Sequence, residues 1–305
     1  MPDRDPLDSA DPNRLTAFDQ HRGLLFSIAY RMLGSVADAE DILQETFIRW
    51  LQASGDDIRS PKAFLITIIT RLCINHLQSA RVQREEYVGQ WLPEPLITDE
   101  GSDPSSLLQA GESLSIAFLV LLERLNPMER AVFLLREIFD YEYAEIAAAL
   151  GRSEANCRQI LRRAKQHVRA ERPRFRASEE EHDELLERFQ QAAGSGDLNA
   201  LVTLLSADVV LHTDGGGKAP ALPNLVHGAN RVARAIVGGI TKLAPSNLVQ
   251  RMVQINGERG IVTYQNGRPF GVFTIHVREG HIAAIYAITN PDKLAHLPGL
   301  PAAPS

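Results

Sequence analysis

One stretch of the sequence, Asp140 to Arg169, constrains the fold more than any other part of the chain. It predicts two helices with a three-residue break, because Gly151 favours a left-handed helix end and Ser153 is a good N-cap. Such a pair, with a basic outer face on its second helix, is typical of the helix-turn-helix motif that enters the DNA major groove. On this pattern alone, an ordinary helical hairpin with a solvated basic face is the alternative. The apolar stripe of the second helix consists of Cys157, Leu161, Ala164 and Val168, and its basic face of Arg158, Arg162, Lys165 and Arg169.

The length and the cysteines indicate a multidomain cytoplasmic protein. A chain of 305 residues is too long for one ordinary core. No apolar run approaches the roughly 18–20 residues of a membrane span, and the polar N-terminus lacks the pattern of a signal peptide. Cys73 and Cys157 lie in predicted helices without a CxxC pattern or a histidine neighbour. We therefore expect reduced core cysteines, no membrane contact, no metal site and no cofactor.

Charge is distributed in blocks, so the net charge of −6 describes no single part of the chain. Residues 152–176 contain nine basic and two acidic residues, which favours a nucleic-acid partner for this block. Residues 85–123 contain eight acidic residues and no Lys or Arg, which is typical of a solvated linker. Each block therefore needs its own partner hypothesis.

Helices are predicted in the front part of the chain, over residues 15–87 and again over 113–176. Between them, residues 88–112 form a predicted acidic linker, rich in proline and glycine. Residues 179–295 begin with helices and end in four strands, which are joined at Asn256-Gly257, Asn266-Gly267 and Glu279-Gly280. We therefore expect a multidomain fold, in which all-α domains precede an α+β domain with a curved antiparallel sheet.

The helical blocks resemble a bacterial RNA polymerase sigma factor of the extracytoplasmic-function type. Residues 26–50 (FSIAYRMLGSVADAEDILQETFIRW) are similar to region 2 of that family, which docks on RNA polymerase. Residues 61–85 (PKAFLITIITRLCINHLQSARVQRE) are similar to the segment that melts and reads the −10 promoter element. Residues 125–168, which contain the helix-turn-helix, are similar to region 4, the reader of the −35 element. The resemblance implies a factor that gives core RNA polymerase its promoter specificity.

The resemblance also implies a role for an acidic helix face formed by Asp41, Gln44 and Glu45. These residues stand at i, i+3 and i+4, so they share one face of a helix. By resemblance this face docks on the β′ clamp helices of core RNA polymerase, where complementary charge steers association. Without the family match, a solvated helix surface is the alternative. The acidic linker, by the same resemblance, threads a basic channel of the polymerase.

DNA contacts are implied in two places. Asn75 corresponds to the site where a −10 base leaves the stack, and its amide offers a donor and an acceptor to a base edge. An exposed or capping asparagine is the alternative. Expected phosphate contacts near the −10 element are Lys62, Arg71, Arg81 and Arg84. The residues that match the −35-contacting face are Arg158, Gln159, Arg162, Arg163 and Lys165, and the sequence leaves open which of them read bases.

Three short strings narrow the resemblance to a subgroup of this family that carries a fused SnoaL-like, NTF2-like cone domain in place of a separate anti-sigma protein. The strings are WLPEP at 91–95, DGGGK at 214–218 and NPDKL at 290–294. The resemblance implies that this domain regulates the sigma module in cis, and we predict that Trp91 packs near the DGGGK loop. The implied regulatory contacts are Trp91, Pro93, Glu94, Asp214, Gly215, Gly216, Gly217, Lys218, Asn290, Pro291, Asp292, Lys293 and Leu294.

A second class of function is a helix-turn-helix regulator with a ligand-sensing or vestigial-enzyme domain. One general base with hydrogen-bonding neighbours would suffice for proton abstraction in a cone-shaped cavity. The candidates lack a tight catalytic spacing, so we expect no enzymatic activity and leave a small ligand open. We also expect the free protein to be monomeric. The candidate cavity residues are His212, Asp214, Tyr264, His276 and Tyr286.

Overall fold

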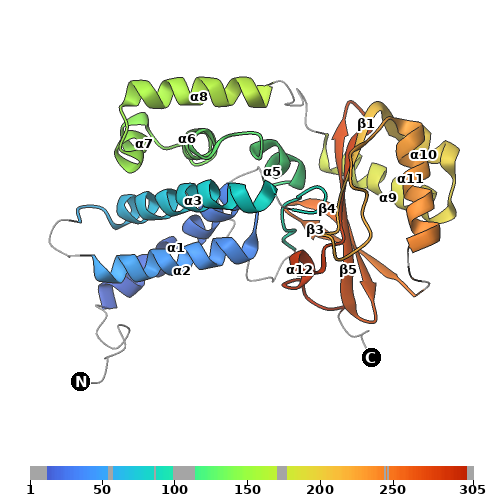
Figure 1. The fold of residues 1–305 in the computed structure, drawn as a ribbon, viewed down its shortest axis with the longest axis horizontal. Coiled ribbons are helices and arrows are strands. Elements are labelled where there is room, and N and C mark those ends of the chain that lie inside the picture. Colours follow the sequence, from blue (N-terminus) through green and yellow to red (C-terminus); the bar gives the residue numbers. More distant parts are fainter. Residues whose placement is uncertain are drawn as a thin grey trace. The chain divides into compact units, whose positions relative to one another are not determined.

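The computed structural model of the protein describes residues 12–53, 58–85, 87–98, 114–169, 177–243, 245 and 247–300. Contacts within the chain divide it into two compact units (Figure 1). The first unit holds the described residues within 1–83 and 121–170, and the second holds those within 84–102, 114–120 and 171–305. Among the residues that the structure describes, no helix is both long enough and apolar enough to cross a membrane.

Three long helices form the first half of the first unit. The predicted break between the first two is confirmed, because Gly34 has a φ of 68° and the Ser35 hydroxyl accepts a hydrogen bond from the Asp38 backbone at 3.2 Å. Apolar side chains such as Leu25 and Leu65 are fully buried among these helices, which stabilises the unit by about 1.5–3 kcal/mol for each side chain. The helices are α1 (Pro12–Leu33), α2 (Val36–Gln52) and α3 (Pro61–Glu85).

The second half of the first unit contains the helix-turn-helix. Its leading helix starts at a capping box, in which Asn126 Oδ1 accepts from the Glu129 backbone N–H at 2.9 Å and the Glu129 side chain accepts from Asn126. The short helix α5 (Ile116–Leu122) precedes it in the chain. The helices of this half are α6 (Pro127–Glu137), α7 (Tyr143–Leu150) and α8 (Glu154–Arg169).

The two halves of the first unit pack on each other through α1 and α6. The Arg130 guanidinium of α6 donates to the backbone carbonyl of Met32, near the C-terminal end of α1, at 2.6 Å. A cation at this end of a helix is favoured by the helix dipole. Arg31 lies 5.5 Å from the centre of the Phe139 ring, and burial lowers its pKa to about 10. The helix-turn-helix and the three long helices therefore form one body.

The second unit is an α+β domain built on a six-stranded sheet. The order of the strands in the sheet is β2-β1-β6-β5-β4-β3, so β2 and β3 are its edges. The helices are α9 (Glu179–Ser195), α10 (Leu198–Leu204), α11 (Ala229–Leu243) and α12 (Pro291–Leu294). The strands are β1 (Leu205–Asp214), β2 (Val226–His227), β3 (Val249–Ile255), β4 (Glu258–Gln265), β5 (Arg268–Arg278) and β6 (His281–Ile288).

The three predicted hairpin turns are confirmed, but the prediction of a wholly antiparallel sheet is wrong. Asn256, Asn266 and Glu279 have positive φ angles of 54°, 50° and 53°, each followed by a glycine, as two-residue hairpin turns require. The sheet is mixed, however, because β1 runs parallel to β6. The turn signals in the sequence report only strands that are joined directly, so they carried no information about this pairing.

The two faces of the sheet have different covers. Helices α9, α10 and α11 lie on one face (Figure 1), over a cluster of aliphatic side chains that includes Leu186, Leu211 and Ile275. On the other face, a second buried cluster joins Tyr286 of β6 to Leu92. This second face therefore holds residues of the predicted linker against the C-terminal domain.

Candidate nucleic-acid interface and regulatory site

The helix-turn-helix has the geometry that its sequence predicts. Gly151 ends α7 in the left-handed region, with φ 64° and ψ 41°, and the Ser153 hydroxyl accepts from the backbone N–H of Asn156 at 3.2 Å. The predicted apolar stripe is confirmed, because Cys157, Leu161, Ala164 and Val168 are all buried. Both cysteines of the chain are free and buried, and burial raises the pKa of the Cys157 thiol. The opposite face of α8 is thus left for a partner.

The basic face of α8 is open but partly engaged. Arg158 donates to Glu154 at 2.8 Å, and its guanidinium lies 4.5 Å from the centre of the Tyr143 ring. Lys165 pairs with Glu137 at 2.8 Å. The side chains of Gln159, Arg162 and Arg163 are exposed, and that of Arg169 lies outside the described residues. Nucleic acid that contacts Arg158 or Lys165 has to replace these acidic partners.

A groove of about 450 Å³ runs beside this face. Cationic side chains that line a groove suit a phosphate backbone, contacts to which position a protein on DNA without reading its sequence. The lining residues are Tyr143, Arg158, Leu161, Arg162, Lys165 and Gln166.

The acidic face predicted on α2 lies at the surface. Asp41 and Gln44 are exposed, and Glu45 is partly exposed. Glu45 accepts from Arg49 one turn further along the same helix, at 2.7 Å. Such an exposed pair contributes little to stability, so Glu45 can exchange Arg49 for a basic partner at small cost.

The residues predicted to contact the −10 element differ in whether they are free for DNA or already contact other parts of the protein. Asn75 is exposed on α3, although the residues before it are buried. The Arg71 guanidinium donates to the carbonyl of Ala149, at the end of α7, at 2.8 Å. Lys62 lies 5.5 Å from the centre of the Tyr141 ring. The structure therefore brings Lys62 and Arg71 against the helix-turn-helix half, while the side chains of Arg81 and Arg84 lie outside the described residues.

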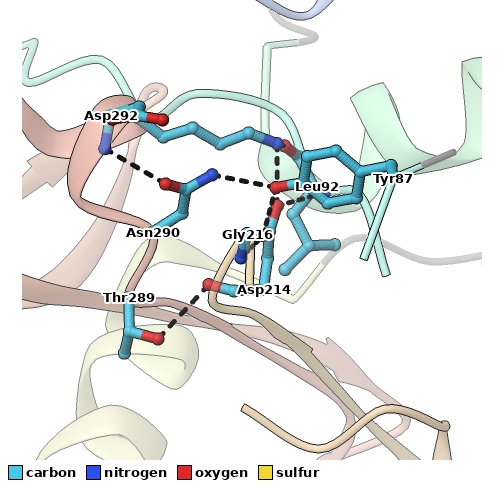
Figure 2. A network of polar contacts seen from close by, with 8 residues as sticks. Tyr87, Leu92, Asp214, Gly216, Thr289, Asn290 and Asp292 are labelled. Carbon is cyan, nitrogen blue, oxygen red and sulfur yellow. Dashed lines mark hydrogen bonds and ion pairs between the residues drawn. The ribbon is translucent and has the colours of Figure 1, made fainter. Parts of the chain in front are cut away.

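The candidate regulatory site is centred on the carboxylate of Asp214, which is 0% exposed (Figure 2). Oδ1 accepts from the Tyr87 hydroxyl at 2.6 Å and from the Gly216 backbone at 3.0 Å. Oδ2 accepts from the Leu92 backbone at 2.8 Å and from Lys293 Nζ at 2.7 Å. Burial, and then the hydrogen bond to Asp214, raise the pKa of Tyr87, so its hydroxyl remains a donor. Two of the four bonds therefore come from the segment after α3, one from Tyr87 and one from Leu92 of the predicted linker.

Lys293 completes the charge balance of this site. Its side chain is 6% exposed, and its ammonium also donates to the Leu92 carbonyl. The Trp91 ring lies with its centre 4.1 Å from Lys293 Nζ, and the Tyr87 ring with its centre at 5.1 Å. An ammonium on aromatic faces gains an electrostatic attraction that strengthens as water is excluded. The structure thus places Trp91 beside the Asp214 loop, with Lys293 as its direct contact.

The parallel pairing of β1 and β6 explains why these residues meet. Parallel strands end at the same edge of a sheet, so the loop after Asp214 and the segment after Ile288 lie together. The backbone N–H groups of Thr289 and Asn290 donate to the Asp214 carbonyl at 2.7 and 3.0 Å. Asn290 also donates to the Tyr87 hydroxyl at 2.9 Å.

Within the DGGGK string, Gly216 allows the backbone to approach the side chain of Asn290 closely. Gly216 has a φ of 59°, and a Cβ at this position would lie 2.2 Å from Asn290 Nδ2. Only glycine fits both the angle and the space. The remaining predicted contacts are dispersed: Pro93 and Leu294 are buried, Glu94 is partly buried, Pro291 begins α12, and Lys218 pairs with Asp292 at the surface.

Sequence reasoning missed Tyr87 and Asn256. Tyr87 lies four residues before Trp91, and an aromatic side chain in an otherwise polar stretch was the available signal. Asn256 is predicted only as a turn residue, yet its side chain is 1% exposed and bonds to Leu96 and Leu114. Turn chemistry accounts for its backbone angle but predicts no partner for its amide.

The candidate cavity residues do not face the helices. Val209 and Leu211 belong to the cluster under the helices, so His212 and Asp214, by strand alternation, lie on the other face. His212 stacks on Tyr286, with ring centres 4.9 Å apart, and Tyr264 and Tyr286 lie in the cluster that contains Leu92. Asp214 itself is engaged by the linker. This face is therefore a binding surface for the linker.

Family models match both halves of the first unit. The Sigma-70 region 2 model matches residues 17–82, and the Sigma-70 region 4 model matches residues 115–168. The matched regions contain the acidic face of α2, the exposed Asn75 and the helix-turn-helix. Together they define the class of protein, a sigma-70-type factor of bacterial transcription initiation.

Whole-chain relatives extend the likeness through the C-terminal domain. The chain is 38% identical to the ECF RNA polymerase sigma factor SigJ of Mycobacterium tuberculosis, over 93% of this chain and 94% of that one. It is 30% identical to the probable ECF sigma factor SigI of the same species, over 91% of this chain and 93% of that one. The crystal structure of SigJ superposes with a TM-score of 0.76 at 36% identity, covering 92% of this chain and 98% of the other. The chain belongs to the extracytoplasmic-function family of RNA polymerase sigma factors, and so it directs transcription initiation.

Proposed function

We propose that the C-terminal domain regulates this sigma factor in cis by holding the linker between regions 2 and 4. The observation that carries the proposal is the fully buried Asp214 carboxylate, which accepts hydrogen bonds from Leu92 of the linker and from Tyr87, the residue just before the linker. Residues held in this way are not free to enter a polymerase channel. Docking of the linker on the C-terminal domain therefore restrains initiation, and its release permits initiation.

We further propose how the sigma module divides its contacts with its two partners. The α2 face of Asp41, Gln44 and Glu45 docks on the β′ clamp helices of core RNA polymerase, and Asn75 contacts a −10 base. The exposed side chains of α8 contact the −35 element. This division is supported by the surface position of Asp41, Gln44 and Asn75 and by the basic groove beside α8.

Replacing Tyr87 with phenylalanine tests the regulatory role from the side of the linker. The variant loses a donor to Asp214 and the acceptor for Asn290, and so weakens the dock by about 1–3 kcal/mol without removing the ring. We expect more transcript than from the unaltered chain when core polymerase and a cognate promoter are supplied in vitro.

The matched control for Tyr87→Phe is Lys218→Ala. Lys218 belongs to the DGGGK motif that contains Asp214, but its side chain makes only an exposed ion pair with Asp292. Its loss should therefore leave the transcript level unchanged. Equal transcript from the unaltered chain and from Tyr87→Phe would contradict regulation through this site.

Arg158→Ala tests the assignment of α8 as the −35 reader. If Arg158 pairs with a guanine edge, its loss should cost about 1–3 kcal/mol and relax preference at one base pair of the −35 element. Binding to a set of promoters with single −35 substitutions measures this preference. Uniformly weaker binding to all of them would make Arg158 a phosphate contact.

No catalytic role is proposed for the C-terminal domain, and the free protein is proposed to be a monomer. The supporting observation is that the candidate acid and base residues lie on the face that binds the linker, where Asp214 is already engaged. A ligand that copurified with the protein and changed transcription would argue for a sensor instead.

A further inference from the structure

Asn256 contacts the linker at a second place, which lies across the sheet from Asp214. It occupies the turn between β3 and β4, whereas Asp214 ends β1, and three other strands separate β1 from β3. The Asn256 side chain is 1% exposed although it belongs to a hairpin turn, a position where side chains are ordinarily solvated.

The Asn256 amide holds two residues that are far apart in the chain. Its Oδ1 accepts from the Leu96 backbone at 2.9 Å, and its Nδ2 donates to the Leu114 carbonyl at 3.1 Å. The Asn256 backbone N–H also donates to the Leu96 carbonyl at 2.8 Å. An asparagine side chain offers one acceptor group and one donor group, and both are used here.

Neighbouring backbone bonds reinforce the first of these two attachments, and apolar packing of Ile116 against the sheet supports the second. Ile97 forms an antiparallel bridge with Ile255, and the Thr98 backbone donates to the Gln254 carbonyl at 2.8 Å. The linker thereby extends the exposed edge of the sheet at the end of β3, a common mode of segment recognition. Leu114, in contrast, is attached to the turn by the Asn256 amide.

The next hairpin turn shows that this arrangement exceeds what a turn requires. Asn266 is likewise an asparagine of positive φ followed by glycine, with φ angles of 50° and 77°. Its side chain is exposed and bonds to Asn247, which is exposed too. Positive φ therefore explains both asparagines, but it does not explain the buried, doubly bonded amide of Asn256.

We propose that Asn256 is a second linker clamp, which ties the two flanks of residues 99–113 to one turn and so sets the length of the tether between regions 2 and 4. With the clamp closed, Leu96 and Leu114 both contact the same amide group. With the clamp open, the eighteen steps from 96 to 114 span up to about 60 Å of extended chain. This inference rests on the proposed docking of the linker, but it concerns a different residue, a different edge of the sheet and a different flank.

Asn256→Asp weakens the two attachments unequally, because a carboxylate can still accept from Leu96, whereas it loses the donor to Leu114 and repels the Leu114 carbonyl. Helix α5 has seven residues and begins two residues after Leu114. A helix so short depends on its attachments, which are the Asn256 bond to Leu114 and the burial of Ile116 against the sheet. We expect amide exchange over 116–122 in the full-length chain to become about tenfold faster, while residues 92–98, which backbone bonds also hold, lose less protection. Asn256→Gly preserves the turn and removes the whole side chain, so it should accelerate exchange on both flanks.

Asn266→Asp is the matched control, since it makes the same change at the same position of the next turn and should alter neither flank. If Asn256→Asp accelerated amide exchange equally in β1, β6 and residues 116–122, Asn256 would be a residue that stabilises the whole domain and no specific clamp. No acceleration would overturn the clamp. If Tyr87→Phe leaves transcription unchanged while Asn256→Asp still frees residues 116–122, the regulatory proposal fails and the clamp stands.

Transcription from spacing variants tests the tether. We expect Asn256→Asp to reduce discrimination between promoters whose −10 and −35 elements differ by two base pairs in spacing, about 7 Å of DNA. The unaltered chain and Asn266→Asp should keep that discrimination. Unchanged discrimination by Asn256→Asp would overturn the role of Asn256 in setting the tether length.

Discussion

Asp214→Asn is expected to destabilise the C-terminal domain by about 3–5 kcal/mol, because it leaves the Lys293 ammonium buried without its counter-charge. Lys293 is 6% exposed and Asp214 is 0% exposed, so water cannot take over the lost interaction. The amide nitrogen also presents a donor in place of one carboxylate oxygen, either Oδ1, which accepted from Tyr87 and Gly216, or Oδ2, which accepted from Leu92. Hydrogen exchange of β1 and β6 in the full-length chain measures the loss, since these central strands report opening of the whole domain.

Two further variants make the Asp214 prediction specific. Lys293→Met combined with Asp214→Asn removes both charges and should recover part of the lost stability, because no unpaired charge remains. Lys218→Ala removes an exposed pair with Asp292 and should cost no more than about 1 kcal/mol. A double variant no more stable than Asp214→Asn alone would show that the charge balance is not what holds the site.

Arg130→Met is expected to loosen the packing of the helix-turn-helix half on the three long helices. Arg130 is 3% exposed and bonds to the Met32 carbonyl and to Glu123, at 2.6 and 2.7 Å. Methionine fills much of the space but leaves that carbonyl without its donor, a loss of about 2–3 kcal/mol. Spin labels on α3 and α8 should report a broader and longer distance distribution in the full-length chain.

The control for Arg130→Met is Arg136→Met on the same helix. Arg136 is partly exposed and pairs with Asp140 and Glu142, which lie in its own half of the unit. Its loss should leave the distance between α3 and α8 unchanged. If both variants give the distribution of the unaltered chain, the two halves are held together by apolar packing and the Arg130 contact is incidental.

Features that depend on a few neighbouring residues could be predicted from the sequence. The left-handed end at Gly151, the cap at Ser153 and the turn at Asn266 each follow from the preferences of the residues that form them. The apolar stripe of α8 follows from helical spacing alone. The family resemblance then supplied roles for exposed residues, such as Asn75, that spacing does not distinguish from solvated ones.

Features that depend on distant residues could not be predicted in the same way. The parallel pairing of β1 with β6, the bond from Arg130 to Met32 and the bond from Tyr87 to Asp214 each join segments that are remote in the chain. By local pattern, Tyr87 is only the last residue of the predicted first helical block, and Arg130 is an ordinary helix residue. Only the fold determines that one reaches a buried carboxylate and the other a helix end.

The parallel β1–β6 pair joins the two ends of the proposed regulatory site without using the hairpin turns that lie between these strands in the chain. Asp214 ends one strand and Asn290 follows the other, and their adjacency depends on a single ladder of backbone bonds. The hairpins from β3 to β5 could therefore be lengthened, trimmed or exchanged with those of another domain while Asp214 and Lys293 stayed in place. Such chimaeras would keep the hydrogen bonds from Tyr87 and Leu92 to Asp214 but exchange the turn that carries Asn256. The two attachments of the linker can therefore vary separately in engineered chains or over evolution.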